Sequence, residues 1–218
     1  MKKILIGAFI LIMYMSTNNA SAQKGFNIAV KAIPQFSFLE NKDDNDNNSF
    51  ERVTTFNAGF GIGAGYDFNN KYGIGLDALY SLQGQRYKLN GIEYNQKVDY
   101  LKVPLYFVYN GPISDKVSFL GKIGPQVSFL TDSKLNDEDG NTINSDTKDQ
   151  FKSVTFGGVI IAGTQFKLKS DLFLSTAFRF DCDFTNAEDD GYTNYQTSRA
   201  DSYNMTAGLE VGLKYTLK

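Results

Sequence analysis

The chain has 218 residues, with 22 Lys and Arg against 24 Asp and Glu and no histidine, so its net charge is −2. It offers no basic block for a nucleic acid, and the absence of histidine excludes Ser-His-Asp and Cys-His catalysis and the usual zinc ligand sets. Its single cysteine, Cys182, excludes an internal disulfide framework. We therefore expect a protein that is not an enzyme, with no catalytic residue, cofactor or metal.

The first 22 residues have the pattern of a cleavable signal peptide. A basic start at 1–3 precedes an apolar segment at 4–15, which is too short to cross a bilayer as a helix. Small residues then predict cleavage between Ala22 and Gln23. The remaining 23–218 are expected to form one domain.

The first expected strand, 26–38, has apolar side chains at even positions, and Pro34 within it predicts a bulge or a strand end. A loop at 39–52, rich in Asn and Asp, separates it from the next strand. Strands 53–68 and 72–82 follow, joined by a tight turn. Their glycines recur at every second residue, which is a strand pattern and not that of a phosphate-binding loop.

The second half of the chain repeats this pattern. A loop at 84–96 precedes a strand at 98–109, and a strand at 117–130 is expected to be broken at Gly124-Pro125. The polar loop 131–150 resembles a calcium-binding loop at Asp137, Asp139 and Asn141 but lacks its glycine and its final glutamate. The remaining expected elements are strands 151–168, 171–184 and 202–218, with a loop at 185–201.

Even strand number, with long and short connections in alternation, is typical of bacterial outer-membrane proteins. We therefore predict an all-β fold, an eight-stranded antiparallel up-and-down transmembrane β-barrel in the bacterial outer membrane. Its bulky apolar face should meet lipid, and its face rich in glycine and charge should line a narrow lumen. A soluble lipocalin-type barrel, with the apolar face inward, is the alternative. The aromatic side chains expected in girdles at the membrane surface include Tyr66, Phe68, Tyr72, Tyr106, Tyr109 and Tyr215.

Charges that face a closed lumen need partners, because unpaired buried charge is costly. The mixed signs predict a salt-bridge network that plugs the barrel, and a charged filter in a narrow pore is the alternative. Cys182 lies between Asp181 and Asp183 on the lipid side and is expected to be inert. The lumen charges predicted from strand parity are Lys31, Asp77, Lys102, Lys122, Arg179, Asp181, Glu210 and Lys214.

The chain resembles the PorT-like small outer-membrane β-barrels of Bacteroidetes. The likeness is carried by 25–39 (GFNIAVKAIPQFSFL), 100–105 (YLKVPL), 124–126 (GPQ) and 208–218 (GLEVGLKYTLK). It implies an eight-stranded barrel and, for some members, a role in protein secretion.

We expect a monomer that acts structurally or as a binding platform through its outer loops. A narrow passive channel and an accessory role in secretion are the alternatives. The expected partners are outer-membrane lipid, lipopolysaccharide and the barrel-assembly machinery, with no nucleic acid.

Overall fold

The computed structural model describes residues 25–46, 51–189, 191 and 200–217. The predicted signal peptide and its cleavage position between Ala22 and Gln23 lie outside the described residues. No helix in the described part of the chain is long and apolar enough to cross a membrane. The elements are β1 (Gly25–Asn41), α2 (Lys42–Asp46), β2 (Glu51–Val53), β3 (Thr55–Asp67), β4 (Tyr72–Ser81), β5 (Gly84–Leu89), β6 (Ile92–Pro112), β7 (Val117–Asn136), β8 (Thr142–Asn144), η1 (Lys148–Gln150), β9 (Val154–Lys167), β10 (Leu172–Asp183) and β11 (Ser202–Thr216).

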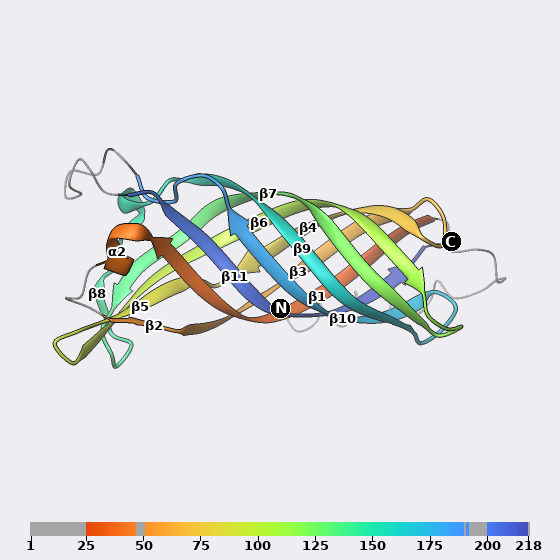
Figure 1. Ribbon diagram of the computed structural model, residues 1–218, viewed down its shortest axis with the longest axis horizontal. Coiled ribbons are helices and arrows are strands. Elements are labelled where there is room, and N and C mark those ends of the chain that lie inside the picture. The colour runs from red at the N-terminus through yellow and green to blue at the C-terminus, as the bar shows by residue number, and fades with distance from the viewer. Residues whose placement is uncertain (1–24, 47–50, 190, 192–199, 218) are drawn as a thin grey trace, which may run out of the picture.

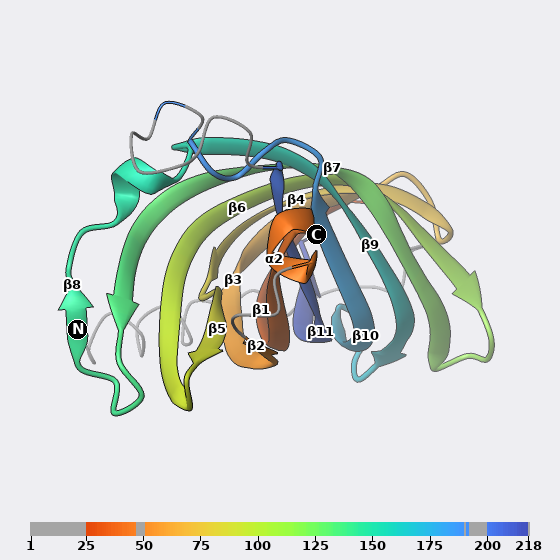
Figure 2. The same ribbon diagram turned by 60° about the vertical axis from the view of Figure 1, so that its left-hand side comes forward.

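Eight of these strands form a closed ring (Figures 1 and 2). The hydrogen-bonded order is β1, β3, β4, β6, β7, β9, β10 and β11, and β11 pairs back with β1. Every neighbouring pair in the ring is antiparallel, including the first and last strands. Closure leaves these strands without a free edge in the ring. The predicted all-β, eight-stranded antiparallel up-and-down barrel is therefore confirmed.

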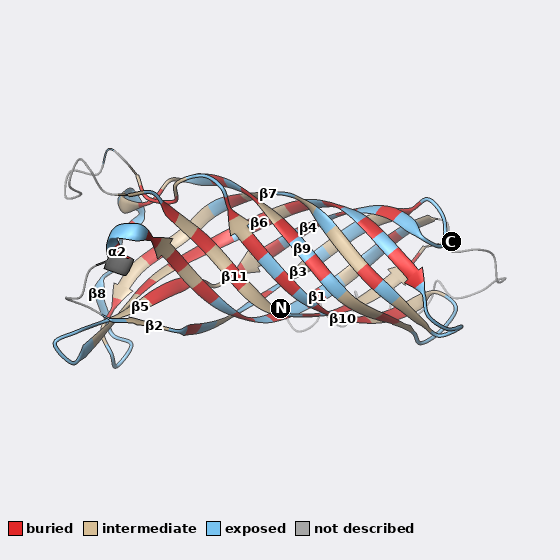
Figure 3. Cartoon of the chain, viewed as in Figure 1, coloured by how far each residue is buried: buried red, intermediate tan, exposed pale blue. Residues whose placement is uncertain are grey.

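Burial alternates residue by residue along the strands, as the striping in Figure 3 shows. On β1, Phe26 is 66% and Val30 55% exposed, whereas Lys31 and Gln35, at the other parity, are buried. Each of the eight ring strands presents large apolar side chains outward in this way. The apolar face therefore points away from the lumen, as predicted for a membrane barrel and opposite to a lipocalin. Representative outward side chains, one for each ring strand in chain order, are Phe26, Ile62, Ile74, Leu105, Ile123, Ile160, Phe178 and Val211.

The two ends of the barrel differ in their connections. Tight turns at 68–71, 113–116 and 168–171 lie at one end, where β1 begins and β11 ends. The long connections lie at the other end, together with α2, β2, β5 and β8 (left in Figure 1). We call these the turn end and the loop end; by the outer-membrane plan they face the periplasm and the outside.

The expectation of a loop at 84–96 is wrong. β5 and the start of β6 form a hairpin there, with Gln85 opposite Gln96 and a two-residue turn at Asn90-Gly91. Both turn residues have positive φ, 52° and 86°, which is the type I′ geometry that Asn-Gly favours. The polar stretch 131–150 is also partly ordered, since β7 continues to Asn136 and pairs with β8.

The strands run through their prolines without a break, contrary to expectation. β1 keeps one register with β11 on both sides of Pro34, and the pairing merely skips Ile33 and Pro34. β7 likewise continues past Gly124-Pro125, whose pairing with β9 is uninterrupted. In both places the strand lacks only the local ladder contacts that a proline cannot make.

Candidate lumen charge network

The structure places all eight predicted lumen charges inside the ring. They come from six strands (β1, β4, β6, β7, β10 and β11), because each has the inward parity of its strand. Their side chains range from fully buried to 16% exposed. We refer to the following as the lumen charge network: Lys31, Asp77, Lys102, Lys122, Arg179, Asp181, Glu210 and Lys214.

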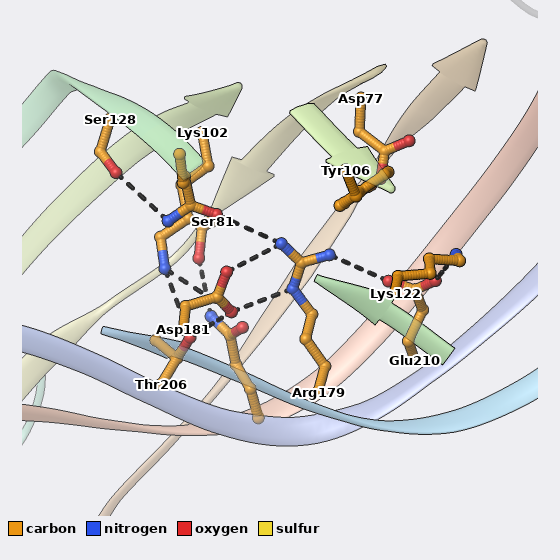
Figure 4. Close-up of polar contacts among 12 residues, drawn as sticks. Asp77, Ser81, Lys102, Tyr106, Lys122, Ser128, Arg179, Asp181, Thr206 and Glu210 are labelled. Atoms are coloured by element: carbon orange, nitrogen blue, oxygen red, sulfur yellow. Dashed lines mark hydrogen bonds and ion pairs between the residues drawn. The ribbon is translucent and has the colours of Figure 1, made fainter. Parts of the chain in front are cut away.

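Glu210 is the centre of this network and has no exposed surface. Its Oε1 accepts a hydrogen bond from Lys122 Nζ at 2.8 Å, and its Oε2 accepts one from Arg179 Nη1 at 2.9 Å (Figure 4). Lys31 Nζ lies 3.6 Å from the same Oε1. Three cations from three different strands therefore converge on one carboxylate.

Arg179 connects this centre to the loop-end half of the lumen. Its Nε and Nη2 donate to the two oxygens of Asp181 at 2.9 and 2.8 Å, a bidentate pair. The same Nη2 donates at 3.3 Å to Gln126 on β7, two strands away around the ring. Thr206 and Lys102 contact Asp181 as well, at 2.9 and 4.0 Å. The guanidinium therefore links side chains of β7, β10 and β11 inside the lumen (Figure 4).

On the turn-end side of Glu210, Lys31 forms an ion pair and a hydrogen bond with Asp77. Lys31 Nζ also donates to the hydroxyl of Tyr106 at 3.1 Å and lies 5.1 Å from its ring centroid. Lys122 Nζ lies 5.4 Å from the same centroid. The ring of Tyr106 therefore makes cation–π contacts with the ammonium groups of both Lys31 and Lys122.

Tyr106 corrects one expectation, because it was assigned to the membrane-surface girdle but is buried inside the lumen. It is 2% exposed, and the even parity of β6 that points Lys102 inward also points Tyr106 inward. The girdle at the turn end is built from other rings, such as Tyr72 and Tyr109, whose centroids are 5.6 Å apart.

Sequence reasoning also missed two inward carboxylates that strand parity could have found. Asp67, on β3, accepts hydrogen bonds from Asn27 at 3.1 Å and from Lys214 at 3.2 Å near the turn end. Asp183, on β10, accepts one from Thr155 at 2.7 Å in the loop-end half. These contacts extend the polar lumen in both directions beyond the lumen charge network.

The loop end of the lumen is closed by an apolar cluster, which we call the outer cap. Tyr100 lies at its base, has no exposed surface and accepts a hydrogen bond from Asn204 at 2.9 Å. Phe151, from the connection before β9, is 4% exposed and pairs with Glu188 of the next long connection. The outer cap consists of Leu39, Val98, Tyr100, Phe151 and Ala187.

The chemistry open to this lumen is limited. The described residues contain no group of three or more metal-ligating side chains placed to hold a metal ion. Cys182 is half-buried between Asp181 and Asp183, both of which are buried. Strand parity therefore points its thiol outward, away from the lumen.

Comparison with known proteins identifies the architecture. A family model described as outer membrane protein beta-barrel domain matches residues 22–187. No curated protein matches the sequence. The structure is similar to Ail of Yersinia pestis (14% identity over 88% of this chain and 99% of that one, TM-score 0.44). It is also similar to Neisserial surface protein A (13% identity over 91% of this chain and 100% of that one, TM-score 0.45). A third similar structure is OprG of Pseudomonas aeruginosa (12% identity over 90% of this chain and 98% of that one, TM-score 0.47).

Proposed function

The chain belongs to the outer membrane protein β-barrel domain family and lies in the bacterial outer membrane, and we propose that it is a non-enzymatic barrel with a closed lumen. It holds a structured platform above the membrane on its loop end. The closed lumen distinguishes this proposal from a passive channel.

The observation that carries the proposal is the chain of contacts through Arg179 and Glu210. Both side chains are almost fully buried. Together they contact Gln126 and Lys122 on β7 and lie within 3.6 Å of Lys31 on β1, which is four strands away around the ring. Eight strands leave an interior that side chains can fill, so such a layer leaves no room for a water column. The outer cap adds a second, apolar closure between this layer and the loop end.

The platform is a sheet of five strands, formed by the ends of β6 and β7 that continue past the apolar band and by the short strands β2, β5 and β8. β2 pairs with β5, β5 with β6, β6 with β7 and β7 with β8, which forms an open sheet at the loop end. Its tips expose apolar side chains far from the lipid-facing band: Leu89 (41%), Ile92 (48%) and Ile143 (53%). Exposed apolar side chains on a structured sheet support a surface that binds another molecule.

We propose the expected partners on related grounds. Outward apolar side chains on all eight ring strands support contact with outer-membrane lipid around the whole circumference, and hence a monomer inserted by the barrel-assembly machinery. The acidic loop end supports contact with lipopolysaccharide through divalent cations. Light scattering of the detergent-solubilised protein tests the monomer, and a defined dimer mass would contradict it.

Conductance in planar bilayers tests the closed lumen. The wild-type protein is expected to give no discrete current steps. The paired substitution Tyr100→Ala and Phe151→Ala, which removes the outer cap, should not by itself open the pore, because the layer at Arg179 remains. Adding Arg179→Ala should produce steps. Clear single-channel steps from the wild-type protein would refute the proposal in favour of a channel.

A further inference from the structure

The turn-end half of the lumen contains a cavity that the closed layer does not fill. It lies between Lys31, Asp77 and Tyr106 at its inner limit and Asn27, Asp67 and Lys214 toward the turns. The empty space in and around it, part of which is open solvent, is about 510 Å³. We call this cavity the vestibule.

The vestibule is reached from the turn end alone. On its loop-end side Glu210 and Arg179 are almost completely buried, and the outer cap lies beyond them. On its turn-end side the Lys214 side chain is 16% exposed, compared with 5% for Lys31 deeper in. A solute in the periplasm can therefore enter the vestibule, and a solute outside the cell cannot.

Glycines in the wall leave room for the vestibule. Gly63, Gly75 and Gly212 line the vestibule, on three different strands. A Cβ atom at Gly212 would lie 2.8 Å from the Ser175 hydroxyl, and one at Gly63 would lie 2.2 Å from Asp77 Oδ1. Any side chain at either position would fill the hollow or displace its polar lining.

Three lining groups have donors that the protein does not use. Gln165 is 5% exposed, lines the vestibule and has no side-chain hydrogen bond within the described residues. Among the described residues, Lys122 Nζ donates a hydrogen bond to Glu210 alone, and Lys214 Nζ donates one to Asp67 alone. An ammonium group has three donors, so each lysine retains two. The Gln165 amide is not sealed within the wall, so a molecule in the vestibule can reach it and complete these bonds.

These unused donors belong to one side of the vestibule. Gln165 and Ser175 are directly opposite each other on β9 and β10, and Ser175 is opposite Gly212 on β11. Lys214 is the next inward residue on β11 after Gly212, and the ring of Phe173 lies 5.1 Å from its Nζ. An amide, a hydroxyl and an ammonium group therefore border the hollow above Gly212.

We propose that the vestibule binds a small oxyanion, a phosphate or carboxylate group, that enters from the periplasm. Its oxygens accept from the Gln165 amide, from Lys214 and from Lys122. A small cation is disfavoured, because Asp67 already accepts from Asn27 and Lys214 while Asp77 is paired with Lys31. Among the turns at the entrance, Lys71 adds a positive charge, whereas Asp115 and Asp171 offset Lys116 and Lys169 in their own turns.

Nuclear magnetic resonance of the purified barrel in nanodiscs tests this site. Inorganic phosphate and acetate are titrated separately, with the backbone amide of Gly212 and the side-chain amide of Gln165 as reporters. Saturable shifts at both positions are expected for at least one anion. Repeating the phosphate titration in nanodiscs that contain phosphatidylglycerol distinguishes the source of the anion. If the lipid headgroup occupies the site, phosphate should bind more weakly in these nanodiscs; if the natural ligand is a free solute, the phosphate affinity should be unchanged.

Two variants and one control make the test specific. Gln165→Leu leaves every ion pair intact and should weaken binding about tenfold, as expected for a lost hydrogen bond to a charged group. Lys214→Met should weaken it by more than tenfold. Lys88→Met, on the exposed hairpin, removes the same charge outside the site and should change nothing. The heat-dependent shift in gel mobility confirms that each variant is folded.

Other outcomes overturn the proposal. Saturable shifts at Gly212 with methylammonium and none with either anion would show a cation site. No saturable shift with any probe would show that the free donors serve water alone. Equal anion binding by Gln165→Leu and wild type would place the anion elsewhere. None of these results depends on whether the barrel conducts, so they leave the proposed closed lumen untouched.

Discussion

Replacing Glu210 by Gln removes the charge on which three cations converge, while it preserves the volume of the side chain. Arg179 keeps Asp181 and Lys31 keeps Asp77, but Lys122 loses its only carboxylate partner in the described structure. Breaking a buried ion pair from one side costs about 3–5 kcal/mol, because the other charge stays buried. The retained amide oxygen can still accept one bond, so we expect a loss of about 3 kcal/mol in the free energy of unfolding.

Urea unfolding in lipid vesicles, extrapolated linearly to zero denaturant, measures this loss. Glu93→Gln is the matched control. Glu93 pairs with Arg86 at 3.3 Å on the exposed hairpin, where the two side chains are 32% and 39% exposed. Such surface pairs contribute about 0–1 kcal/mol. Adding Lys122→Met to Glu210→Gln should recover about 1–3 kcal/mol, since it removes the charge left alone. If Glu210→Gln and Glu93→Gln lower stability equally, the lumen charge network does not hold the barrel together.

Three further substitutions test the wall and the outer cap. Phe178→Arg, at an outward position that is 77% exposed, should cost about 2–4 kcal/mol of unfolding free energy, whereas Ile113→Arg in a turn should cost about 0–1 kcal/mol. Gly124→Ala places a Cβ 1.9 Å from the Leu105 carbonyl oxygen and should prevent refolding into detergent, while Gly59→Ala, with its nearest contact at 3.5 Å, should refold normally. Phe151→Ala should cost about 3–5 kcal/mol within the outer cap and expose residues 137–153 to added protease, with the exposed Ile143→Ala as the unaffected control.

Strand parity explains how much of the lumen could be predicted from the sequence. Side chains two residues apart in a strand lie on the same face of the sheet. Once one residue is known to point inward, every second residue along that strand is therefore placed inside as well. Lys102 and Glu210 were located in this way. The same rule places Tyr106, Asp67 and Asp183 inside. Tyr106 was misassigned because aromatic character was given more weight than its position in the strand.

The pairing of particular charges could not be predicted in the same way. Arg179 on β10 meets Gln126 on β7, and Lys31 on β1 meets Asp77 on β4; in each case one strand lies between the two. Which inward residues reach the same height depends on the stagger of the strands around the closed ring, and parity carries no information about that stagger.

The hairpin at β5 and β6 was missed for a different physical reason. It stands above the apolar band, and at its tip, residues 88–92, successive residues are all exposed, so they need not alternate between apolar and polar. The local signal was the turn itself, because Asn90-Gly91 has the sequence that a two-residue hairpin favours. Polar composition alone therefore does not separate a loop from a strand that lies outside the membrane.

A charged lumen is not the arrangement that would give the folded barrel the greatest stability. Replacing a buried ion network by well-packed apolar side chains is often neutral or stabilising by about 1–4 kcal/mol. In this chain, however, the outward faces are already apolar on every ring strand. Apolar inward residues would turn each strand into a continuous apolar segment, which is prone to aggregate before the barrel closes. Lys102 and Lys122 would keep buried charges without partners if only Arg179, Asp181 and Glu210 were changed. Replacing all five together, the cations by Met and the carboxylates by Leu, should therefore keep or raise the unfolding free energy and increase aggregation of the urea-diluted chain. Light scattering during refolding measures that aggregation, and a variant that refolds as cleanly as wild type would show that the charges serve the folded state alone.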